Sequence, residues 1–309
     1  MFDWEVYLLT LQKSGVLLAY IALGYVLRRT KKLPDSADKV MSGLVTMLFC
    51  PAYSIATLAQ TMRPENLGQN LRLLGLGAGV LAAVLLLAAV LGRSLGRTCL
   101  ERRSVTYAMT FSNYGYFGYP LVAGVLGQAM LGNMMAFTIS ITLATNTLGY
   151  LLFAQGTMHW KKVLLTPMVL AVAAGVGLGL CDVTLPGTVR EGLMGIGSCM
   201  SPVSMLLGGF VLGGLPLKEL LRGGRSYLYA ALRLVGIPAL FVAALYLLGA
   251  RGMYLMIPGI YLALPLGMNV VVFPASLGYD TRENARMCFV SYLLAIPLLP
   301  LWFTVLQSL

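Results

Sequence analysis

The sequence has few charged residues and few of the side chains that build metal or catalytic sites. Only 11% of its 309 residues are charged, whereas a soluble domain carries about 25%, so the chain cannot cover a water-facing surface. None of its five cysteines forms a Cys-x-x-Cys pair or lies near the single histidine, His159. These absences argue against a disulfide framework, a zinc site or a haem attachment site, and we expect no metal or cofactor.

Acidic residues are missing from the middle of the apolar segments. All eleven Asp and Glu residues lie in loops or near segment ends, whereas proton pumps and cation channels usually keep a carboxylate inside the membrane. A hydrolase within the membrane needs a nucleophile with a base or a metal, and the one histidine lies in a loop. The sequence therefore counts against a pump, a cation channel and an enzyme.

What the sequence does contain is a series of long apolar segments. Apolar residues make up 58% of the chain, and about 20 of them in a helix span the ~30 Å core of a bilayer. The connections are short, and Met1–Glu5 is too short and acidic for the n-region of a cleaved signal peptide. We predict an all-α integral membrane protein without a separate soluble domain. Its ten transmembrane helices are expected at about 6–27, 40–62, 71–92, 104–127, 131–154, 163–181, 192–215, 227–248, 253–276 and 287–306.

The basic residues indicate how these helices are oriented. Sixteen of the 22 Lys and Arg residues lie in the five loops that follow odd-numbered segments, and only four lie in the opposite loops. Because cytoplasmic loops carry the excess of Lys and Arg, both termini are expected outside the cell membrane, the inner membrane of a bacterium. The net charge of +11 is thus a topology signal and not a mark of nucleic-acid binding.

Two of the segments contain residues that interrupt helices. Proline removes a backbone donor, and glycine weakens a helix by about 1 kcal/mol. Backbone groups freed in hydrocarbon need protein or water partners, so an interruption of this kind lines a cavity. The interrupting residues of the fourth and ninth segments are Asn113, Gly115, Gly118, Pro120, Pro265, Gly267 and Asn269.

The two interruptions lie at corresponding places in the two halves of the chain. Pro120 and Pro265 are separated by about half its length, and such matched breaks are typical of transporters built from two repeats. Five segments are an odd number, so the second repeat must be inverted relative to the first. We expect repeats at residues 1–155 and 156–309 that form one membrane domain. The alternative is that the two prolines merely kink packed helices, since Gly and Pro are common in membrane helices.

Broken helices also predict an anion site. The second halves, expected to start near Tyr119 and Gly267, would each expose unpaired N–H groups and about +0.5 of a charge. Pro120 suits a first helical turn, where its missing donor costs nothing. Two such ends facing one cavity favour an anion without a buried Lys or Arg. Asn113 and Asn269 could supply amide donors beside them.

These residues also carry a resemblance to a known family. The segments GYVLRRTKKLPDSADKVMSGLVTMLFCPAYSIATLA, SNYGYFGYPLVAGVLGQ, AALRLVGIPALFV and LPLGMNVVVFPASLGYD with SYLLAIPLLPLWF resemble, in this order, the auxin efflux carrier family. The chain is similar to a compact, bacterial-type member. The resemblance implies crossed, broken helices 4 and 9, a scaffold of helices 1, 2, 6 and 7, and a transport part of helices 3–5 and 8–10. It also implies organic anion substrates: indole carboxylate auxin in plants, and malate, malonate and similar carboxylates in bacteria.

The resemblance assigns residues to the site, and one departure from the plant pattern puts a proton-linked role in doubt. It places Asn113, Pro120, Pro265 and Asn269 at the crossing of helices 4 and 9. Plant carriers have an acidic residue and a lysine at the start of helix 3, where this chain has Gln69, Asn70 and Arg72, so a proton-linked role there is in doubt.

Several further residues are candidates with alternatives. Asn146 could bind substrate or form an interhelical bond, and Tyr114 could stack on a substrate or fill space. Arg233 could anchor an anion, but a guanidinium that reaches the cytoplasmic loop is the favoured interpretation. The candidate substrate-binding residues are Asn113, Tyr114, Pro120, Asn146, Pro265, Gly267, Asn269, Pro51, Tyr53 and Ser204, with Arg233 as the candidate anion anchor.

Together these patterns predict a secondary transporter of small organic anions, mono- or dicarboxylates, that works by alternating access. The first alternative is a sodium–organic anion symporter of the bile acid type, and a second is a carboxylate receptor or regulatory subunit that moves nothing. The expected partners are the anion and membrane lipid, with a homodimer as one candidate assembly.

Overall fold

The structure, a computed structural model, describes residues 3–154 and 165–309, and within these ranges the ordered elements are helices. The first helix, α1 (Trp4–Arg29), starts where the Asp3 carboxylate accepts hydrogen bonds from two backbone N–H groups, and it ends with two arginines in its last turn. Both ends suit the helix dipole. The other helices are α2 (Ala37–Leu44), α3 (Cys50–Thr61), α4 (Leu67–Leu95), α5 (Cys99–Thr110), α6 (Tyr119–Ala144), α8 (Pro167–Leu180), α9 (Gly187–Ser198), α10 (Met200–Leu212), α11 (Leu217–Leu220), α12 (Gly224–Ala231), α13 (Ile237–Leu247), α14 (Met253–Ala263), α15 (Asn269–Ser276) and α16 (Arg282–Ser308).

Many of these helices join into stretches that could cross a bilayer. Among the described residues, seven stretches are long and apolar enough: Trp4–Arg29, Ala37–Thr61, Pro64–Leu95, Tyr114–Gly149, Gly187–Leu212, Gly224–Leu247 and Arg282–Ser308. The apolar helices α8 and α14 are shorter. The chain is therefore an all-helical, multi-pass membrane protein, as predicted from its composition.

Several of the prolines are accommodated by π-helical turns. The turns Val45–Phe49, Tyr114–Gly118 and Leu232–Gly236 each end two residues before a proline, namely Pro51, Pro120 and Pro238. In a π turn each N–H bonds five residues back, so the chain widens just before the residue that has no N–H to donate. The second half of the fourth segment consequently starts at Tyr114 and not near Tyr119 as predicted, and Pro120 lies inside that half.

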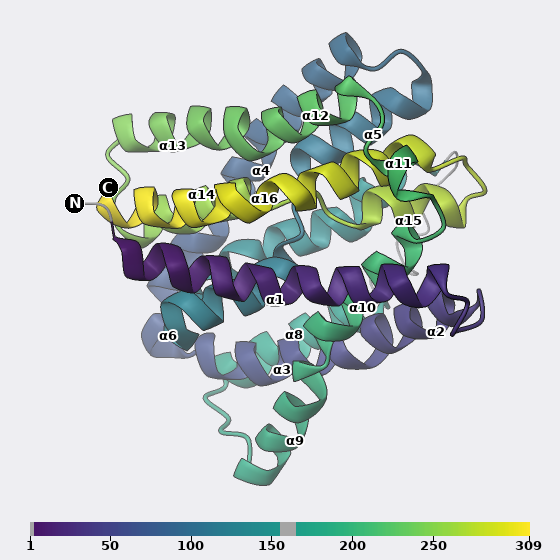
Figure 1. Ribbon diagram of the computed structural model, residues 1–309. Coiled ribbons are helices and arrows are strands. Elements are labelled where there is room, and N and C mark those ends of the chain that lie inside the picture. The colour runs from purple at the N-terminus through teal and green to yellow at the C-terminus, as the bar shows by residue number, and fades with distance from the viewer. Residues whose placement is uncertain (1–2, 155–164) are drawn as a thin grey trace.

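Small residues bring the helix backbones close together. α1 packs along α10 and α16, α3 packs on α8 and α9, and α4 packs on α5 and α6 (Figure 1). A Cβ atom added to Gly209 of α10 would lie 1.8 Å from the Ile21 carbonyl oxygen of α1, and one added to Gly24 would lie 2.0 Å from the Leu206 carbonyl oxygen. The pair α1–α10 is thus held at a distance that only glycine permits, as is usual in membrane helices.

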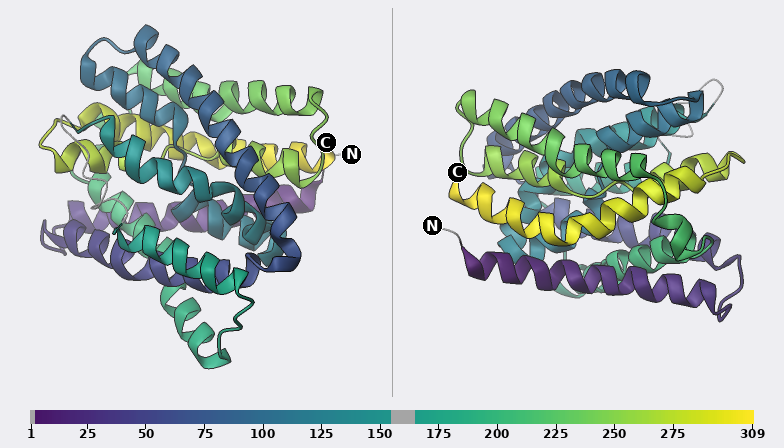
Figure 2. Two further views of the ribbon diagram at one scale, coloured as in Figure 1. Left: turned by 180° about the vertical axis from the view of Figure 1, so that it is seen from behind. Right: turned by 45° about the horizontal axis from the view of Figure 1, so that its top comes forward.

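The two ends of the chain lie next to each other on one side of the molecule (Figure 1; Figure 2). α2, α11 and α15 lie at the opposite side (Figure 1). The expected boundary between the halves, residues 155 and 156, falls in the segment outside the described residues, as do His159 and the two lysines that follow it.

Gly127 interrupts α6 near the end of its first half. It adopts φ +85°, a conformation that favours glycine.

Candidate functional site

The two interruptions predicted from the sequence meet each other in space. α5 and α14 both stop, and the extended residues that follow pair as an antiparallel bridge between Ser112 and Leu266. The N–H of Asn113 donates to the Pro265 carbonyl oxygen at 2.9 Å. Backbone groups released from helices cannot remain unpaired in an apolar interior, and here the two broken segments satisfy each other.

Gly267 allows the two segments to come this close. Its N–H donates to the Phe111 carbonyl oxygen at 3.1 Å. A Cβ atom at this position would lie 3.2 Å from that oxygen and 3.3 Å from the Ser112 carbonyl oxygen. A larger residue would therefore press against the backbone acceptors of the opposite segment and weaken the pairing.

Arg233 ties together the two helices that end at this junction. Its side chain is 0% exposed, and its guanidinium donates to the carbonyl oxygens of Met109 at 2.9 Å and Tyr261 at 3.3 Å. These carbonyls belong to the last turns of α5 and α14, where helix dipoles place partial negative charge. The favoured expectation that Arg233 reaches the cytoplasmic loop is wrong, because its helix turns this residue toward the protein interior.

The second helix halves begin beside the bridge. The Oδ1 atom of Asn113 accepts a hydrogen bond from the N–H of Tyr116 at 3.3 Å, and its Nδ2 atom donates to the Tyr292 hydroxyl. Asn269 is the first residue of α15, whose start has no side-chain cap. Both starts carry N–H groups without helical partners and hence partial positive charge.

A cavity of about 300 Å³ lies against both breaks. This volume is at the lower end of those seen for small-molecule sites. Its lining combines hydroxyl, amide and thioether groups, and no Lys, Arg, Asp or Glu is among the described residues that form it. They are Thr46, Met47, Cys50, Ser54, Tyr107, Ser112, Asn113, Tyr114, Gly115, Tyr116, Tyr119, Thr142, Thr145, Asn146, Thr166, Pro167, Met168, Met200, Gly267, Met268 and Asn269.

The structure divides the candidate residues into two groups. Those that line the cavity are Asn113, Tyr114, Asn146, Gly267 and Asn269. Those outside its lining are Pro51, Tyr53, Pro120, Ser204, Pro265 and Arg233. The prolines shape the backbone around the cavity without forming its wall.

Individual contacts explain these positions. Tyr53 is buried and stacks on Tyr119 with 6.4 Å between ring centroids. The amide of Asn146 donates at 2.8 Å to the Thr142 carbonyl oxygen of its own helix, so it forms no bond to another helix through this donor. Ser204 is buried, and its hydroxyl has no hydrogen-bond partner among the described residues.

One wall of the cavity was not predicted from the sequence. Thr142 and Thr145 line it together with Asn146, and the Tyr114 hydroxyl donates to the Thr142 hydroxyl at 3.0 Å. Thr138, one turn earlier, pairs with the Tyr119 hydroxyl at 2.6 Å. Threonines at positions 138, 142 and 145 recur at helical spacing on one face, and this pattern could have identified the wall.

The helix 3 residues that depart from the plant pattern lie away from the cavity. Gln69 donates to the Asn133 side chain at 2.7 Å, and Asn70 donates to the Thr61 carbonyl oxygen at 2.9 Å. Arg72 is exposed. Gln69 and Asn70 thus hold neighbouring helices together, and none of the three residues lines the cavity.

Comparisons with known proteins agree with these features. Residues 16–157 and 152–303 match the family described as membrane transport protein. The chain is also 23% identical over 303 residues to an "uncharacterized transporter" of Methanothermobacter thermautotrophicus, a similarity that covers 94% of this chain and 96% of that relative. The family match confirms the resemblance to auxin efflux carriers found in the sequence. The chain therefore belongs to the membrane transport protein family, that of the auxin efflux carriers, and it is a transporter and not an enzyme.

Proposed function

We propose that this transporter carries small organic anions and holds the carboxylate of a mono- or dicarboxylate between the two breaks. The observation that supports this most is that two helix starts, at Asn113 and Asn269, face one uncharged cavity of about 300 Å³. Each start contributes roughly half a positive charge. Helix starts with free N–H groups are established anion sites, and the two asparagine side chains stand beside them.

The proposed architecture is ten crossings arranged as two inverted five-helix repeats. Support comes from the long stretch Tyr114–Gly149, which Gly127 divides, and from the shorter apolar helices α8 and α14. Termini on one side agree with an even number of crossings (Figure 2). The bridge between Ser112 and Leu266 joins corresponding points of the two halves, as expected where broken helices 4 and 9 cross.

The residues that line the cavity indicate the side of the membrane to which it opens. Thr46, Asn146 and Pro167 line it, and all three lie in the helix portions nearest the basic loops, which we place in the cytoplasm. On the other side, Tyr53 stacks on Tyr119. We therefore assign this arrangement to an inward-facing state, with both termini outside the cell membrane.

Alternating access then requires the transport part to move against the scaffold. In this arrangement the Ser201 hydroxyl of α10 donates to the Tyr116 carbonyl oxygen at 2.8 Å. That bond joins a scaffold helix to the helix 4 break and would have to break in the outward-facing state. We propose this movement for helices 3–5 and 8–10 relative to helices 1, 2, 6 and 7.

Uptake by proteoliposomes tests the substrate class. Carboxylates that raise the melting temperature of the purified protein would be used in counterflow with and without sodium, which separates a uniport or exchange mechanism from sodium symport. Binding without any flux would instead indicate a receptor.

Charge substitutions test the position of the anion. Asn113→Asp retains the acceptor of the Tyr116 N–H and replaces the amide that donates to the Tyr292 hydroxyl by an oxygen to which that hydroxyl can donate. It also places a negative charge at the site, and Asn269→Asp places one at the start of α15. Both should abolish uptake, whereas Asn66→Asp, at the exposed start of α4, should not. Carboxylate binding of near wild-type affinity in the two site variants would show that the anion does not lie between the breaks.

A further inference from the structure

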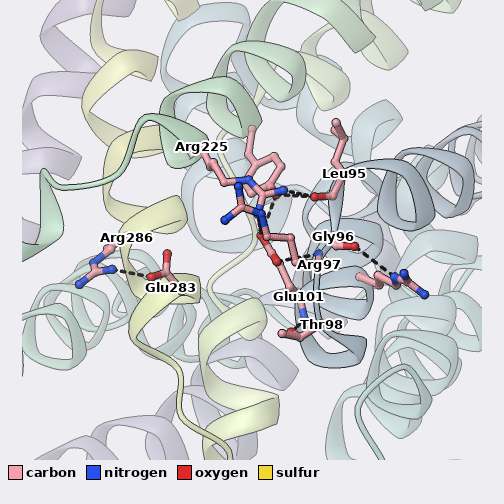
Figure 3. Close-up of polar contacts among 10 residues, drawn as sticks. Leu95, Gly96, Arg97, Thr98, Glu101, Arg225, Glu283 and Arg286 are labelled. Atoms are coloured by element: carbon pink, nitrogen blue, oxygen red, sulfur yellow. Dashed lines mark hydrogen bonds and ion pairs between the residues drawn. The ribbon is translucent and has the colours of Figure 1, made fainter.

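A second and larger cavity lies at the side of the molecule that carries the basic loops. Its volume is about 680 Å³, and it shares no lining residue with the cavity at the breaks. It forms where α5, α12 and α16 begin, and Figure 3 shows the polar contacts around it. It is lined by Arg97, Thr98, Leu100, Glu101, Gly223, Arg225, Ser226, Tyr229, Asp280, Arg282, Glu283, Asn284, Arg286 and Met287.

The acidic side chains of this second cavity are each paired with an arginine. Arg225 contacts Glu101 at 2.7 Å, and Arg286 contacts Glu283 at 2.5 Å (Figure 3). The third pair, Arg282 with Asp280, has its atoms 3.3 Å apart. These pairs cancel most of the charge that the acidic groups bring to the cavity.

Arg97 is the cation that remains. Its backbone N–H donates to the Glu101 carboxylate at 2.8 Å. Its guanidinium forms no hydrogen bond or ion pair with the residues that the structure describes, and it is exposed to the cavity. An arginine in this state retains all of its donors for a ligand.

Three helix starts contribute residues to the second cavity. Thr98 caps α5 by accepting one N–H, and the Asp280 carboxylate accepts the first N–H of α16 at 3.1 Å, whereas the start of α12 has no side-chain cap. Gly223, with φ +100°, turns the chain into α12. The N–H groups of these first turns that have no partner supply partial positive charge to the same space.

The side chain of Ser226 provides the independent sign that a ligand belongs here. Ser226 is only 2% exposed and lines the cavity in the first turn of α12. Its hydroxyl has no hydrogen-bond partner among the described residues, whereas the buried neighbours Tyr229 and Asn284 donate to Glu101 and to Ser104. The Ser226 oxygen is not one of the fully enclosed, unpartnered atoms of the interior, so it opens to the cavity, where a bound anion could accept its hydrogen bond.

We propose that this second cavity binds a phosphate group. A tetrahedral phosphate has oxygen atoms in several directions, so it can accept from helix starts, a hydroxyl and a guanidinium that surround it, whereas a planar carboxylate can use fewer of them. The phosphate could belong to a soluble phosphate or to the headgroup of an anionic phospholipid, because the cavity lies on the side of the basic loops. The inference uses none of the residues proposed to bind the transported anion.

Binding of inorganic phosphate to the purified full-length chain tests the site directly. Calorimetry or the melting temperature at low salt should show saturable binding to the wild-type protein. Ser226→Ala should weaken it roughly 10- to 150-fold, as expected for loss of a hydrogen bond to a charged group. Because this hydroxyl faces the cavity and forms no hydrogen bond with the described residues, the melting temperature without phosphate should remain unchanged.

Arginine variants provide the matched comparison. Arg97→Gln should also weaken phosphate binding. Arg222→Gln removes an exposed arginine that precedes α12 and does not line the cavity, and it should leave phosphate binding unchanged. Wild-type affinity in Ser226→Ala, or equal binding of malonate and phosphate, would overturn the proposal.

Nanodiscs distinguish the two sources of phosphate. Stabilisation by phosphate in detergent without added lipid supports a soluble ligand. A higher melting temperature in nanodiscs that contain phosphatidylglycerol than in phosphatidylcholine alone, present in the wild type and absent in Ser226→Ala, supports a lipid headgroup. If neither inorganic phosphate nor phosphatidylglycerol has an effect that depends on Ser226, the proposal is wrong. Neither measurement depends on transport, so this outcome is separate from any failure of the proposed function.

Discussion

Replacement of Arg233 should separate the stability of the fold from the function of the junction. The guanidinium is fully buried and bonds the last turns of both α5 and α14. No carboxylate pairs with it among the described residues, so the carbonyl oxygens of Met109 and Tyr261 and the face of the Tyr261 ring, 5.9 Å away, are its main compensation. One side chain therefore couples the two first helix halves to each other.

The size of the effect follows from opposing contributions. Hydrogen bonds from a charged group are worth about 1.5–3 kcal/mol each, so the two bonds contribute about 3–6 kcal/mol. Burial of the charge costs several kcal/mol. Arg233→Met loses the bonds but also avoids that cost, so we expect a net loss of only about 1–3 kcal/mol. Arg233→Lys still buries a charge, and its single ammonium lacks the planar fork that reaches both carbonyls. It should therefore be the less stable variant.

Uptake should fall strongly in both variants, although their stabilities should differ. Both variants leave the α5 and α14 ends without a common donor, so uptake should fall strongly even in Arg233→Met, which remains folded. Melting temperature, membrane insertion and proteoliposome uptake would be measured for both. Full uptake by Arg233→Lys with wild-type stability would refute the argument that two carbonyls must be held at once. Full uptake by Arg233→Met would refute any need for the tie.

Three further predictions concern other parts of the molecule. Gly209→Ala places a Cβ atom against the Ile21 carbonyl oxygen and should destabilise the protein by about 1–3 kcal/mol or more. Gly195→Ala is the control, because a Cβ atom there meets open space. Equal melting temperatures for the two alanine variants would contradict the packing argument. Burial opposes ionisation of Glu101, but the Arg97 N–H, the Tyr229 hydroxyl and Arg225 together hold its pKa below 4.5. This contribution to stability should be present above pH 4.5 and lost as pH falls through the lower folded-state pKa, and Glu101→Gln should remove that acid-dependent part from melting curves. Cys99 and Cys181 are both free and exposed, and the proposed topology puts them on opposite sides of the membrane. An impermeant thiol reagent should therefore label Cys181 but not Cys99 in intact cells. The reverse pattern would invert the proposed topology.

The breaks could be predicted because their causes are local. Proline, glycine and asparagine within a few residues weaken a helix whatever surrounds it, and the structure places interruptions at 111–113 and 264–268. The position of Pro120 within a continuing helix was not predictable in the same way. A π turn before it preserves the helix, and a proline in a sequence does not reveal whether such a turn precedes it.

The site required long-range information. Arg233 lies 124 residues from its Met109 partner and 28 residues from its Tyr261 partner, so its depth in the membrane alone could not identify either contact. Tyr107 and Thr142 line the cavity, but hydroxyl residues occur throughout membrane helices and often bond to their own helix. Which hydroxyls face the cavity depends on how the helices pack.

The division of charge at the junction suits the proposed carrier, which must move both with and without its substrate. An unpartnered Lys or Arg in the cavity would bind an anion but would leave a costly buried charge whenever the substrate departed. Here the charged guanidinium of Arg233 is hydrogen-bonded to carbonyl oxygens of α5 and α14 and lies outside the cavity lining. The cavity itself contains helix starts and neutral amides, whose partial charges persist at little cost when it is empty. In the proposed mechanism, a strong cation that fixes the backbone and weak dipoles that face the substrate would therefore allow binding without preventing return of the empty carrier.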